Sequence, residues 1–368
     1  MSKKEMNSGS YELVIVGAGI VGLSTALSAA KSGVHSILCL DQHGVANSVG
    51  ASGDGLRLFR VSYFEHPAYV PLLREAIEAW KALGDDLYVP VGGFYAGPQE
   101  SELIWGALLS AHRHNIPHDE MTAAEAMRRF PQFHLPTEYV GFFEPQAGFV
   151  RAARATRAMA AACERKGVKI QEATVAGLEP IGNRWLVRGD DWEVSANQVI
   201  VAAGNGTGAL VPHVAPHVTS RTHTLLWIEP ASDIWREAPG FGIMNRAGEM
   251  LYGFPALDDM PGVKIGAHHH LPSRTLEDQM ADLVVLLAQY LQHLKKNLLS
   301  RKTCAYDMSP DGNFIIGRVE PGLTVACGFS GHGFKFGSVI GDIVWQAANT
   351  GLPDELGFLD VLRYPWTT

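Results

Sequence analysis

The stretch YELVIVGAGIVGLSTALSAAKSGVHSILCLD, residues 11–41, decides the fold class of this chain. Apart from Glu12, residues 11–16 are apolar and rich in β-branched side chains, which is typical of a buried parallel strand. A glycine-rich turn over residues 17–22 follows, and residues 20–32 carry small and apolar side chains at helical spacing. Residues 34–40 form a second short apolar run. The order strand, turn, helix, strand predicts the β-α-β unit of a dinucleotide-binding fold.

The glycine turn has the pattern Gly-x-Gly-x-x-Gly, and each glycine has a physical reason. Gly17 makes the tight turn, Gly19 lets the backbone approach a pyrophosphate, and Gly22 lets the helix pack closely on the strand. The helix N-terminus offers free N–H groups to the phosphates. Asp41, which closes the second strand, can accept hydrogen bonds from a ribose diol. A glycine turn without a ligand is the alternative, and the pattern alone does not separate NAD from FAD.

The rest of the chain alternates between helical and extended patterns. Thr122, with Glu125 three residues later, is expected to cap a short helix. Residues 44–62, rich in glycine, serine and arginine, are expected to form a functional loop. Helices are expected at residues 71–83, 122–130, 152–166, 276–294 and 336–350. Strands are expected at residues 87–96, 168–171, 173–179, 185–187, 198–202, 221–229, 249–254 and 324–327.

Composition excludes several classes of protein. The chain has 368 residues, which favours two domains, and its formal net charge of −8 makes nucleic acid an unexpected partner. The four cysteines show neither a C-x-x-C pair nor zinc spacing, so a reducing, cytoplasmic setting is expected. Residues 13–30 are interpreted as strand and helix of the folded protein. No other stretch has roughly 18 or more unbroken apolar residues, so no membrane span is expected.

Several segments resemble one branch of flavoproteins in their order and spacing. They are Gly17–Gly22, Arg57-Leu-Phe-Arg60, the Ala202-Ala-Gly204 strand end, Lys264-Ile-Gly-Ala-His268, Cys304-Ala-Tyr306 with the run Ser309–Ile316, and Gly328-Phe-Ser-Gly-His-Gly-Phe-Lys335-Phe. Together they resemble the monomeric sarcosine oxidase and N-methyltryptophan oxidase branch of the D-amino-acid-oxidase-like FAD-dependent oxidoreductase superfamily. Gly55-Leu56 and the run His268-His269-His270 differ from the pattern of that branch, which leaves the substrate open.

The resemblance implies a site that binds a small amine with a carboxylate. Lys264 resembles an oxygen-activating lysine, whose cation would stabilise developing superoxide. Arg60 and Lys335 resemble the pair that grips the substrate carboxylate. For each of these three residues the alternative is an ordinary solvated surface charge.

The resemblance also implies further residues around the reacting atoms. Arg57 matches an arginine beside the flavin ring, and it is counted with Lys264 among the catalytic residues. His268 and Tyr306 match catalytic residues of the pocket that orient or tune the amine. Tyr252 matches a substrate-binding aromatic of the pocket. A half-buried side chain with no role in the chemistry is the alternative for each of the last three.

The cofactor implied by the resemblance is FAD. Cys304 matches the cysteine that attaches FAD covalently, and Arg301 and Lys302 nearby would favour its thiolate; a buried structural cysteine is the alternative. The C-terminal glycines would place backbone N–H groups against the flavin, with the next helix aimed at its ring. The full set expected to bind FAD is Gly17, Gly19, Ile20, Val21, Gly22, Asp41, Gln42, Ser52, Gly53, Val175, Ala203, Gly204, Cys304, Gly328, Gly331, His332, Gly333, Phe334 and Lys335.

The predicted fold class is α/β. A Rossmann-like FAD-binding domain is expected to interleave with a substrate domain that has a mainly antiparallel sheet. The FAD-binding domain is expected at residues 1–85, 145–215 and 300–368. The substrate domain is expected at residues 86–144 and 216–299.

The reaction implied by the resemblance is the oxidation of a small amine or amino acid such as sarcosine, or of another N-methyl or cyclic amino acid. A hydride equivalent passes to the flavin, the imine hydrolyses, and O2 is reduced to H2O2. One alternative is an FAD-dependent dehydrogenase with a non-oxygen acceptor, and another is an oxidase of primary amino acids. An NAD-dependent dehydrogenase and a non-catalytic flavin-binding module are further alternatives. A monomer or a small homo-oligomer is expected.

No metal site is expected. Adjacent histidines on a strand point to opposite faces, so His268, His269 and His270 cannot easily share one ion. His112 and His114 have no further ligands nearby in the sequence, and both are expected to be surface residues.

Overall fold

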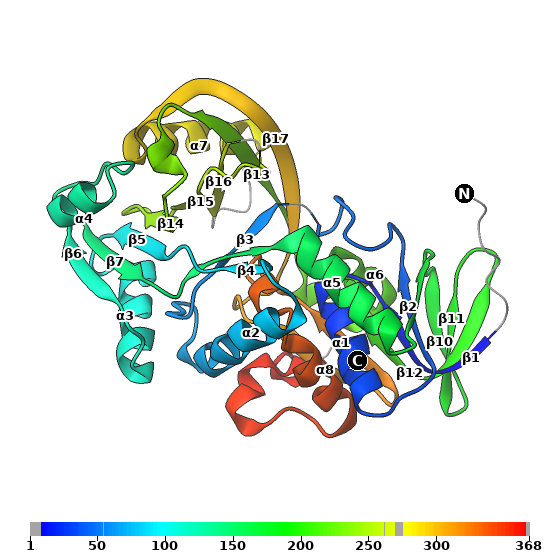
Figure 1. Ribbon diagram of the computed structural model, residues 1–368. Coiled ribbons are helices and arrows are strands. Elements are labelled where there is room, and N and C mark those ends of the chain that lie inside the picture. Colours follow the sequence, from blue (N-terminus) through cyan, green and yellow to red (C-terminus); the bar gives the residue numbers. More distant parts are fainter. Residues whose placement is uncertain (1–8, 54, 261, 269–274, 366–368) are drawn as a thin grey trace.

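Two large sheets dominate the fold, and each has eight strands. The structure is a computed structural model that describes residues 9–53, 55–260, 262–268 and 275–365. The sheet that contains the glycine turn lies at the right of Figure 1, and the other lies at the upper left. A small three-stranded sheet lies between them and consists of β3 (Leu56–Phe59), β4 (Tyr88–Val89) and β8 (Gly148–Arg151).

The first sheet is built around the β-α-β unit that the sequence predicts. Its strands are β1 (Gly9–Val16), β2 (Ile37–Asp41), β9 (Lys169–Glu172), β10 (Gly177–Ile181), β11 (Arg184–Arg188), β12 (Glu193–Val201), β18 (Ile315–Glu320) and β19 (Leu323–Cys327). The strands β9, β2, β1, β12 and β19 pair in parallel, in that order. The strands β10, β11 and β18 add antiparallel pairs at its margins.

Both faces of the second half of β1, residues 13–16, are buried, which explains the unbroken apolar sequence there. Leu13 and Ile15 pack into one core cluster with residues of the helices, whereas Val14 and Val16 belong to a separate cluster on the other face. This alternation follows from the period of two residues in a strand. The helices on the first face are α1 (Ile20–Lys31), α2 (Val70–Leu83), α5 (Ala152–Arg165) and α8 (Ile340–Asn349). The short helix α6 (Thr207–Leu210) lies near the second cluster.

The second sheet is mainly antiparallel, as expected from the sequence. Its strands, in spatial order, are β17 (Leu294–Met308), β13 (Thr219–Pro230), β16 (Val263–His268), β15 (Met250–Phe254), β14 (Gly240–Met244), β5 (Gly93–Gly97), β7 (Val140–Glu144) and β6 (Asp119–Thr122). Only the β5–β14 pair is parallel among the described residues. Its helices are α3 (Glu102–His114), α4 (Ala123–Arg129) and α7 (Leu276–Tyr290).

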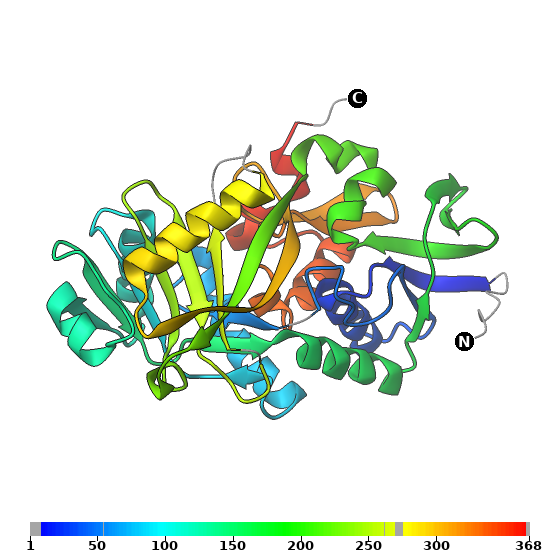
Figure 2. The same ribbon diagram turned by 90° about the horizontal axis from the view of Figure 1, so that it is seen from above.

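The long strands β13 and β17 run from the second sheet toward the first (Figures 1 and 2). The β17 strand contacts the 3-10 turn Gly204–Gly206, which follows the end of β12 in the first sheet. The chain therefore carries side chains of the second sheet to the margin of the glycine turn. Because β17 crosses residue 300, this sheet extends past the domain boundary expected there, and the domain boundaries stay a prediction.

Two helices differ from the expectations drawn from the sequence, and one capping pattern agrees with them. The helix expected to reach residue 294 ends at Tyr290, because the chain turns into an extended conformation at Leu291 before β17 begins. The helix α3 was not expected, although the Ser101 side chain caps its first turn. The capping box of Thr122 and Glu125 is confirmed.

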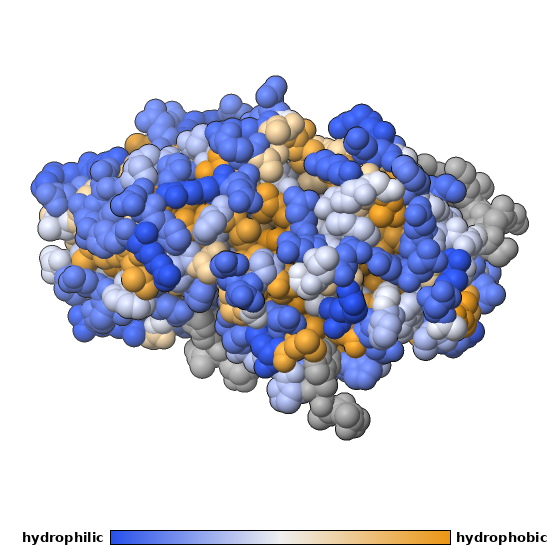
Figure 3. Space-filling view, turned by 90° about the horizontal axis from the view of Figure 1, so that it is seen from below, coloured by the Kyte–Doolittle hydropathy of each residue, from blue (hydrophilic) through white to orange (hydrophobic). Residues whose placement is uncertain are grey.

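The surface is mostly hydrophilic on the face seen from below, with apolar residues showing between the polar side chains near its middle (Figure 3). Within the described part of the chain, no helix combines the length and the apolar character that a membrane crossing requires.

Candidate active site

The glycine turn has the geometry that the sequence predicts. Gly17 has a φ of +107°, and a Cβ atom there would lie 2.3 Å from the carbonyl oxygen of Ala202. A Cβ atom at Gly22 would lie 1.8 Å from the Gly17 carbonyl oxygen, so helix α1 can pack on β1 only with glycine here. Gly19 precedes α1 without a side-chain cap, and the N–H of Ile20 donates to Ser52 Oγ at 3.0 Å. The N-terminus of α1 thus opens onto the space beside the turn.

A cavity of about 470 Å³ lies over this turn. Most residues expected to bind FAD line it: Gly17, Gly19, Ile20, Val21, Asp41, Gln42, Ser52, Gly53, Val175, Ala203, Gly204, Gly331, Gly333 and Phe334. Of the others, Cys304, His332 and Lys335 line a second cavity. Gly22 and Gly328 line neither cavity. Gly22 serves the packing of helix on strand, and Gly328 adopts a positive φ of 64° in the turn after β19.

The residues of the first cavity fit a dinucleotide. The Asp41 carboxylate accepts hydrogen bonds from the N–H groups of Ala18 and His43, each at 2.9 Å, which hold it at the edge of the glycine turn. A carboxylate has lone pairs beyond these two bonds and can still accept from a ribose. Asp307 is a further lining residue, which the sequence analysis missed, and burial raises its pKa to about 6. FAD, when bound, supplies two-electron redox chemistry at this place.

A second cavity of about 90 Å³ adjoins the first. Arg57, Tyr306, Gly331 and Phe334 line both cavities, so they mark the junction between them. The structure brings together at this second cavity the residues expected to act on the substrate, which are Arg57, Arg60, Tyr252, Lys264, His268, Tyr306 and Lys335. They come from β3 and the residue after it, from β15, β16 and β17, and from the 3-10 turn Phe334–Phe336 that follows β19.

Lys264 is a buried cation on β16. Only 3% of its surface is exposed, and its ammonium group donates to the Leu56 carbonyl oxygen at 2.8 Å. The same nitrogen lies 4.9 Å from the centre of the Phe254 ring and 5.7 Å from that of Trp227. Aromatic faces stabilise a buried ammonium group without neutralising its charge. The alternative of a solvated surface lysine is therefore wrong.

Arg57 and Tyr306 line both cavities, and Tyr252 lies beside Tyr306 in the second cavity. Arg57 donates to the carbonyl oxygens of Ala51 at 2.7 Å and Gly53 at 3.0 Å, and its guanidinium carbon lies 5.6 Å from the Phe334 ring centre. The hydroxyl oxygens of Tyr252 and Tyr306 lie 3.1 Å apart. Burial raises the pKa of Tyr252 to about 12 and that of Tyr306 well above its usual value, so both hydroxyls stay protonated.

His268 lies at the end of β16, beside this pair. Its ring centre is 5.8 Å from that of Tyr306, and it stacks on His223 at 5.6 Å. His269 and His270, the other members of the histidine run, lie outside the described residues.

Arg60 is buried and already has a carboxylate partner inside the chain. Its guanidinium group donates to Glu65 Oε1 at 2.5 Å, and it lies over the Phe64 ring at 4.0 Å. Burial alone would raise the pKa of Glu65, but the positive charges of Arg60 and Lys335 help to hold it below its usual value. The sequence analysis did not single out Glu65, which also lines the second cavity.

The segment that carries Arg60 is anchored by a second buried carboxylate. Glu144 accepts hydrogen bonds from the N–H groups of Val61 and Ser62, each at 2.9 Å. Glu144 lies at the end of β7, and burial raises its pKa. This contact fixes the backbone next to Arg60 to the second sheet.

Lys335 and Arg60 both lie near the Tyr63 ring. The Lys335 ammonium nitrogen is 4.9 Å from the ring centre and the Arg60 guanidinium carbon is 5.1 Å from it. Lys335 donates to the His332 carbonyl oxygen at 2.7 Å and to the Tyr63 hydroxyl at 3.4 Å. Burial, together with the positive charge of Arg60, lowers the pKa of Lys335 to about 7.

The Tyr63 hydroxyl continues this chain of hydrogen bonds to His332. His332 Nε2 bonds the Gly312 carbonyl oxygen at 2.8 Å, so this nitrogen carries the proton, and Nδ1 accepts from Tyr63. Burial lowers the pKa of His332 to about 4, so the ring is neutral near pH 7. Tyr63 was not among the residues expected at the site.

Cys304 also lines the second cavity, on β17 opposite His223. It is partly buried, whereas the other three cysteines are fully buried. Arg301 and Lys302, which were expected to favour its thiolate, are exposed and are not among the residues that line either cavity. Arg57 and Lys264 are cations that line the same cavity as Cys304.

Known proteins are similar in sequence to this chain over nearly its whole length. The model of the family described as FAD dependent oxidoreductase matches residues 12–347. The chain is 29% identical to a monomeric sarcosine oxidase of Streptomyces avermitilis, over 94% of this chain and 95% of the relative. It is 30% identical to an N-methyl-L-tryptophan oxidase of Citrobacter koseri, over 93% of this chain and 96% of the relative.

A solved structure supports the fold independently. NikD, described as an unusual amino acid oxidase essential for nikkomycin biosynthesis, superposes with a TM-score of 0.81 at 23% identity, over 96% of this chain and 98% of that chain. At 23% identity, the similarity to NikD shows the fold alone. The family is shown by the match of the sequence to the family model. The glycine turn, the cavity above it and the family match agree, and the chain belongs to the family of FAD-dependent oxidoreductases.

Proposed function

We propose that this enzyme is an oxidase of a small secondary amino acid, with FAD as its redox cofactor and O2 as its electron acceptor. One observation carries the proposal. A small cavity lined by the cations Arg60 and Lys335 adjoins the cavity over the glycine turn and shares Arg57, Tyr306, Gly331 and Phe334 with it. The names of the relatives, a sarcosine oxidase and an N-methyltryptophan oxidase, support the same substrate class.

The lining of the second cavity suits both polar groups of an amino acid. Arg60 and Lys335, which both lie near the Tyr63 ring, supply charge-assisted donors for a carboxylate. The hydroxyl pair of Tyr252 and Tyr306 offers oxygen acceptors to an amine. A substrate held between these groups would present its C–N bond to the junction with the cofactor cavity.

The size of the second cavity favours a small substrate. Its volume of about 90 Å³ is small beside the volume of about 470 Å³ of the first cavity. Sarcosine or a cyclic amino acid such as proline suits this volume better than an amino acid with an indole ring. We therefore place N-methyltryptophan below the smaller amines as a substrate.

The proposal is tested with the purified enzyme in an oxygen electrode. Sarcosine, N-methylalanine, proline, pipecolate, N-methyltryptophan and the primary amino acids are compared, and H2O2 is measured in parallel. We expect oxygen uptake with a matching yield of H2O2 for at least one small secondary amino acid. Reduction of a dye acceptor without oxygen uptake would instead identify a dehydrogenase.

Cys304 is proposed as the covalent attachment point of FAD. Its support is its position, partly buried on β17 and facing a cavity that also contains Arg57 and Lys264. Acid precipitation of the wild-type protein should leave the yellow colour in the pellet, and precipitation of Cys304→Ser should release it into the supernatant. Free FAD in the wild-type supernatant would contradict covalent attachment and leave the proposed reaction untouched.

A further inference from the structure

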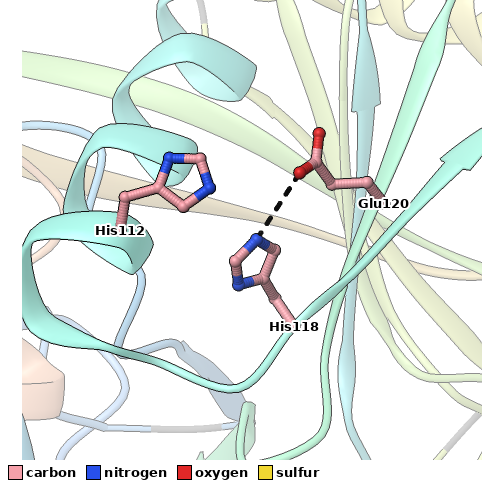
Figure 4. Close-up of side chains that lie close together, drawn as sticks. All are labelled: His112, His118 and Glu120. Atoms are coloured by element: carbon pink, nitrogen blue, oxygen red, sulfur yellow. Dashed lines mark ion pairs between the residues drawn. The ribbon is translucent and has the colours of Figure 1, made fainter.

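A cluster of three side chains outside the two cavities has the composition of a metal site. His112, His118 and Glu120 place one ligand atom each within 4.8 Å of the other two. Figure 4 shows the His112 ring facing His118 and Glu120 from the end of α3, with the His118–Glu120 pair marked. The expectation that His112 lacks further ligands nearby is therefore wrong, because its neighbours come from the segment that follows the helix.

The backbone explains why these three side chains meet. His112 is in the last turn of α3, and the helix ends at Asn115 in the left-handed conformation, with a φ of 50°. The chain then reverses toward β6, which begins at residue 119. His118 and Glu120 are two residues apart in extended chain, so their side chains point to the same side.

The orientation of His118 favours metal binding. Its Nδ1 lies 2.8 Å from the Ile116 carbonyl oxygen, and a carbonyl can only accept, so Nδ1 carries the proton. In the neutral ring the lone pair is then on Nε2, the atom that lies 3.8 Å from Glu120 Oε1. A histidine that ligates a metal commonly donates its other N–H to a carbonyl in this way. The ring also stacks on Phe142 at 4.9 Å, which restricts its rotation.

We propose that His112, His118 and Glu120 bind a Zn²⁺ ion, with a fourth position left to water. Two imidazoles and one carboxylate form a known ligand set for zinc. A tetrahedral ion with bonds of roughly 2.0–2.1 Å separates its ligand atoms by about 3.4 Å. The exposed side chains of His112 and Glu120 can close the remaining distance by rotating toward His118.

The bound ion would join the end of α3 to the start of β6. The same helix contacts the substrate site, because the Ser110 hydroxyl donates to the Tyr63 carbonyl oxygen at 2.5 Å. Zinc should therefore stabilise the folded protein around α3, since an ion that binds only the native state raises its stability. This inference does not depend on the identity of the substrate.

The test uses the FAD-loaded enzyme, treated with EDTA, desalted and titrated with ZnCl2 in a calorimeter. We expect one equivalent that binds at least about tenfold more weakly in His118→Gln and in Glu120→Gln, since even loss of an outer partner costs 10–100-fold. The matched control is His134→Gln, an exposed histidine outside the cluster, which should bind as the wild type does. Saturating Zn²⁺ should raise the melting midpoint of the wild type and of the control by about 2 °C or more, but not that of His118→Gln.

Folding of each variant is checked first by circular dichroism and by its FAD spectrum. Glu120 is exposed, so Glu120→Gln remains informative if His118→Gln does not fold. Two results would overturn the proposal. One is a wild-type enzyme that takes up no Zn²⁺, and the other is a Glu120→Gln variant that keeps the wild-type stoichiometry and affinity.

Discussion

Replacing Lys264 with methionine should slow the reaction of the reduced enzyme with O2 by about 10²–10³-fold. A loss of this size is expected when an enzyme loses one preorganised group that stabilises the charge developing in the transition state. The Lys264 ammonium group is buried, bonded to the Leu56 carbonyl oxygen and enclosed by the Phe254 and Trp227 rings. Methionine has a similar length and no charge, so it suits the aromatic surroundings. Reduction of the enzyme by substrate should change much less.

Stopped-flow measurement of the two half-reactions separates these effects. Lys302→Met is the matched control, because Lys302 is exposed on β17, outside both cavities, and receives the same substitution. It should leave both rates unchanged. If Lys264→Met slowed both half-reactions equally, Lys264 would act in positioning rather than in oxygen activation.

Carboxylate binding should weaken as the pH rises through about 7. Lys335 titrates near this pH in the free enzyme, and lysine is charged below its pKa, so the cation is present at pH 6 and largely lost at pH 9. Methoxyacetate, which has no amine to titrate, isolates this effect. We expect Lys335→Met to bind it about 10–100-fold more weakly than the wild type at pH 6, the value of a hydrogen bond to a charged group. The two proteins should converge at pH 9.

The dissociation constant of methoxyacetate is followed through its perturbation of the FAD absorbance between pH 6 and pH 9. Lys302→Met should reproduce the wild-type pH dependence. A wild-type dissociation constant that stays flat across this range would show that Lys335 does not titrate there, and that Arg60 binds the carboxylate without it.

The parts of the fold that local sequence determines could be predicted. The β1–α1–β2 unit depends on an apolar run, three glycines and a closing Asp41, all within residues 11–41. At Gly17 and Gly22 the structure shows why glycine is needed, because a Cβ atom would collide with the backbone. The capping box of Thr122 is equally local. Helix α3 also has local signals of its two ends, since Ser101 caps its first turn and Asn115 follows its last turn. The helix was nevertheless not predicted from the sequence.

The parts that depend on tertiary pairing could not be predicted in the same way. The sequence of β17 contains LKKNLLSRK, which has no clean alternation, and many of its side chains are exposed. Its extended form depends on its pairing with β13, which runs from Thr219 opposite Met308 to Pro230 opposite Leu294. The sequence analysis therefore extended the preceding helix to residue 294, four residues too far.

The candidate site shows the same division. Resemblance to a family placed Lys264, Arg60 and Lys335, and the structure brings all three to one cavity. Glu65 and Tyr63 could not be placed from sequence, because their roles depend on how the loop after β3 folds back on Arg60 and Lys335.

The central claim, that the second cavity binds a small secondary amino acid for oxidation, is tested most directly by anaerobic titration of the yellow enzyme. Sarcosine, proline and pipecolate are added in turn, and the absorbance at about 450 nm is followed. Bleaching by at least one of them, and not by primary amino acids, is the result that our account predicts. No bleaching by any amine, in an enzyme that dithionite still reduces, would contradict it.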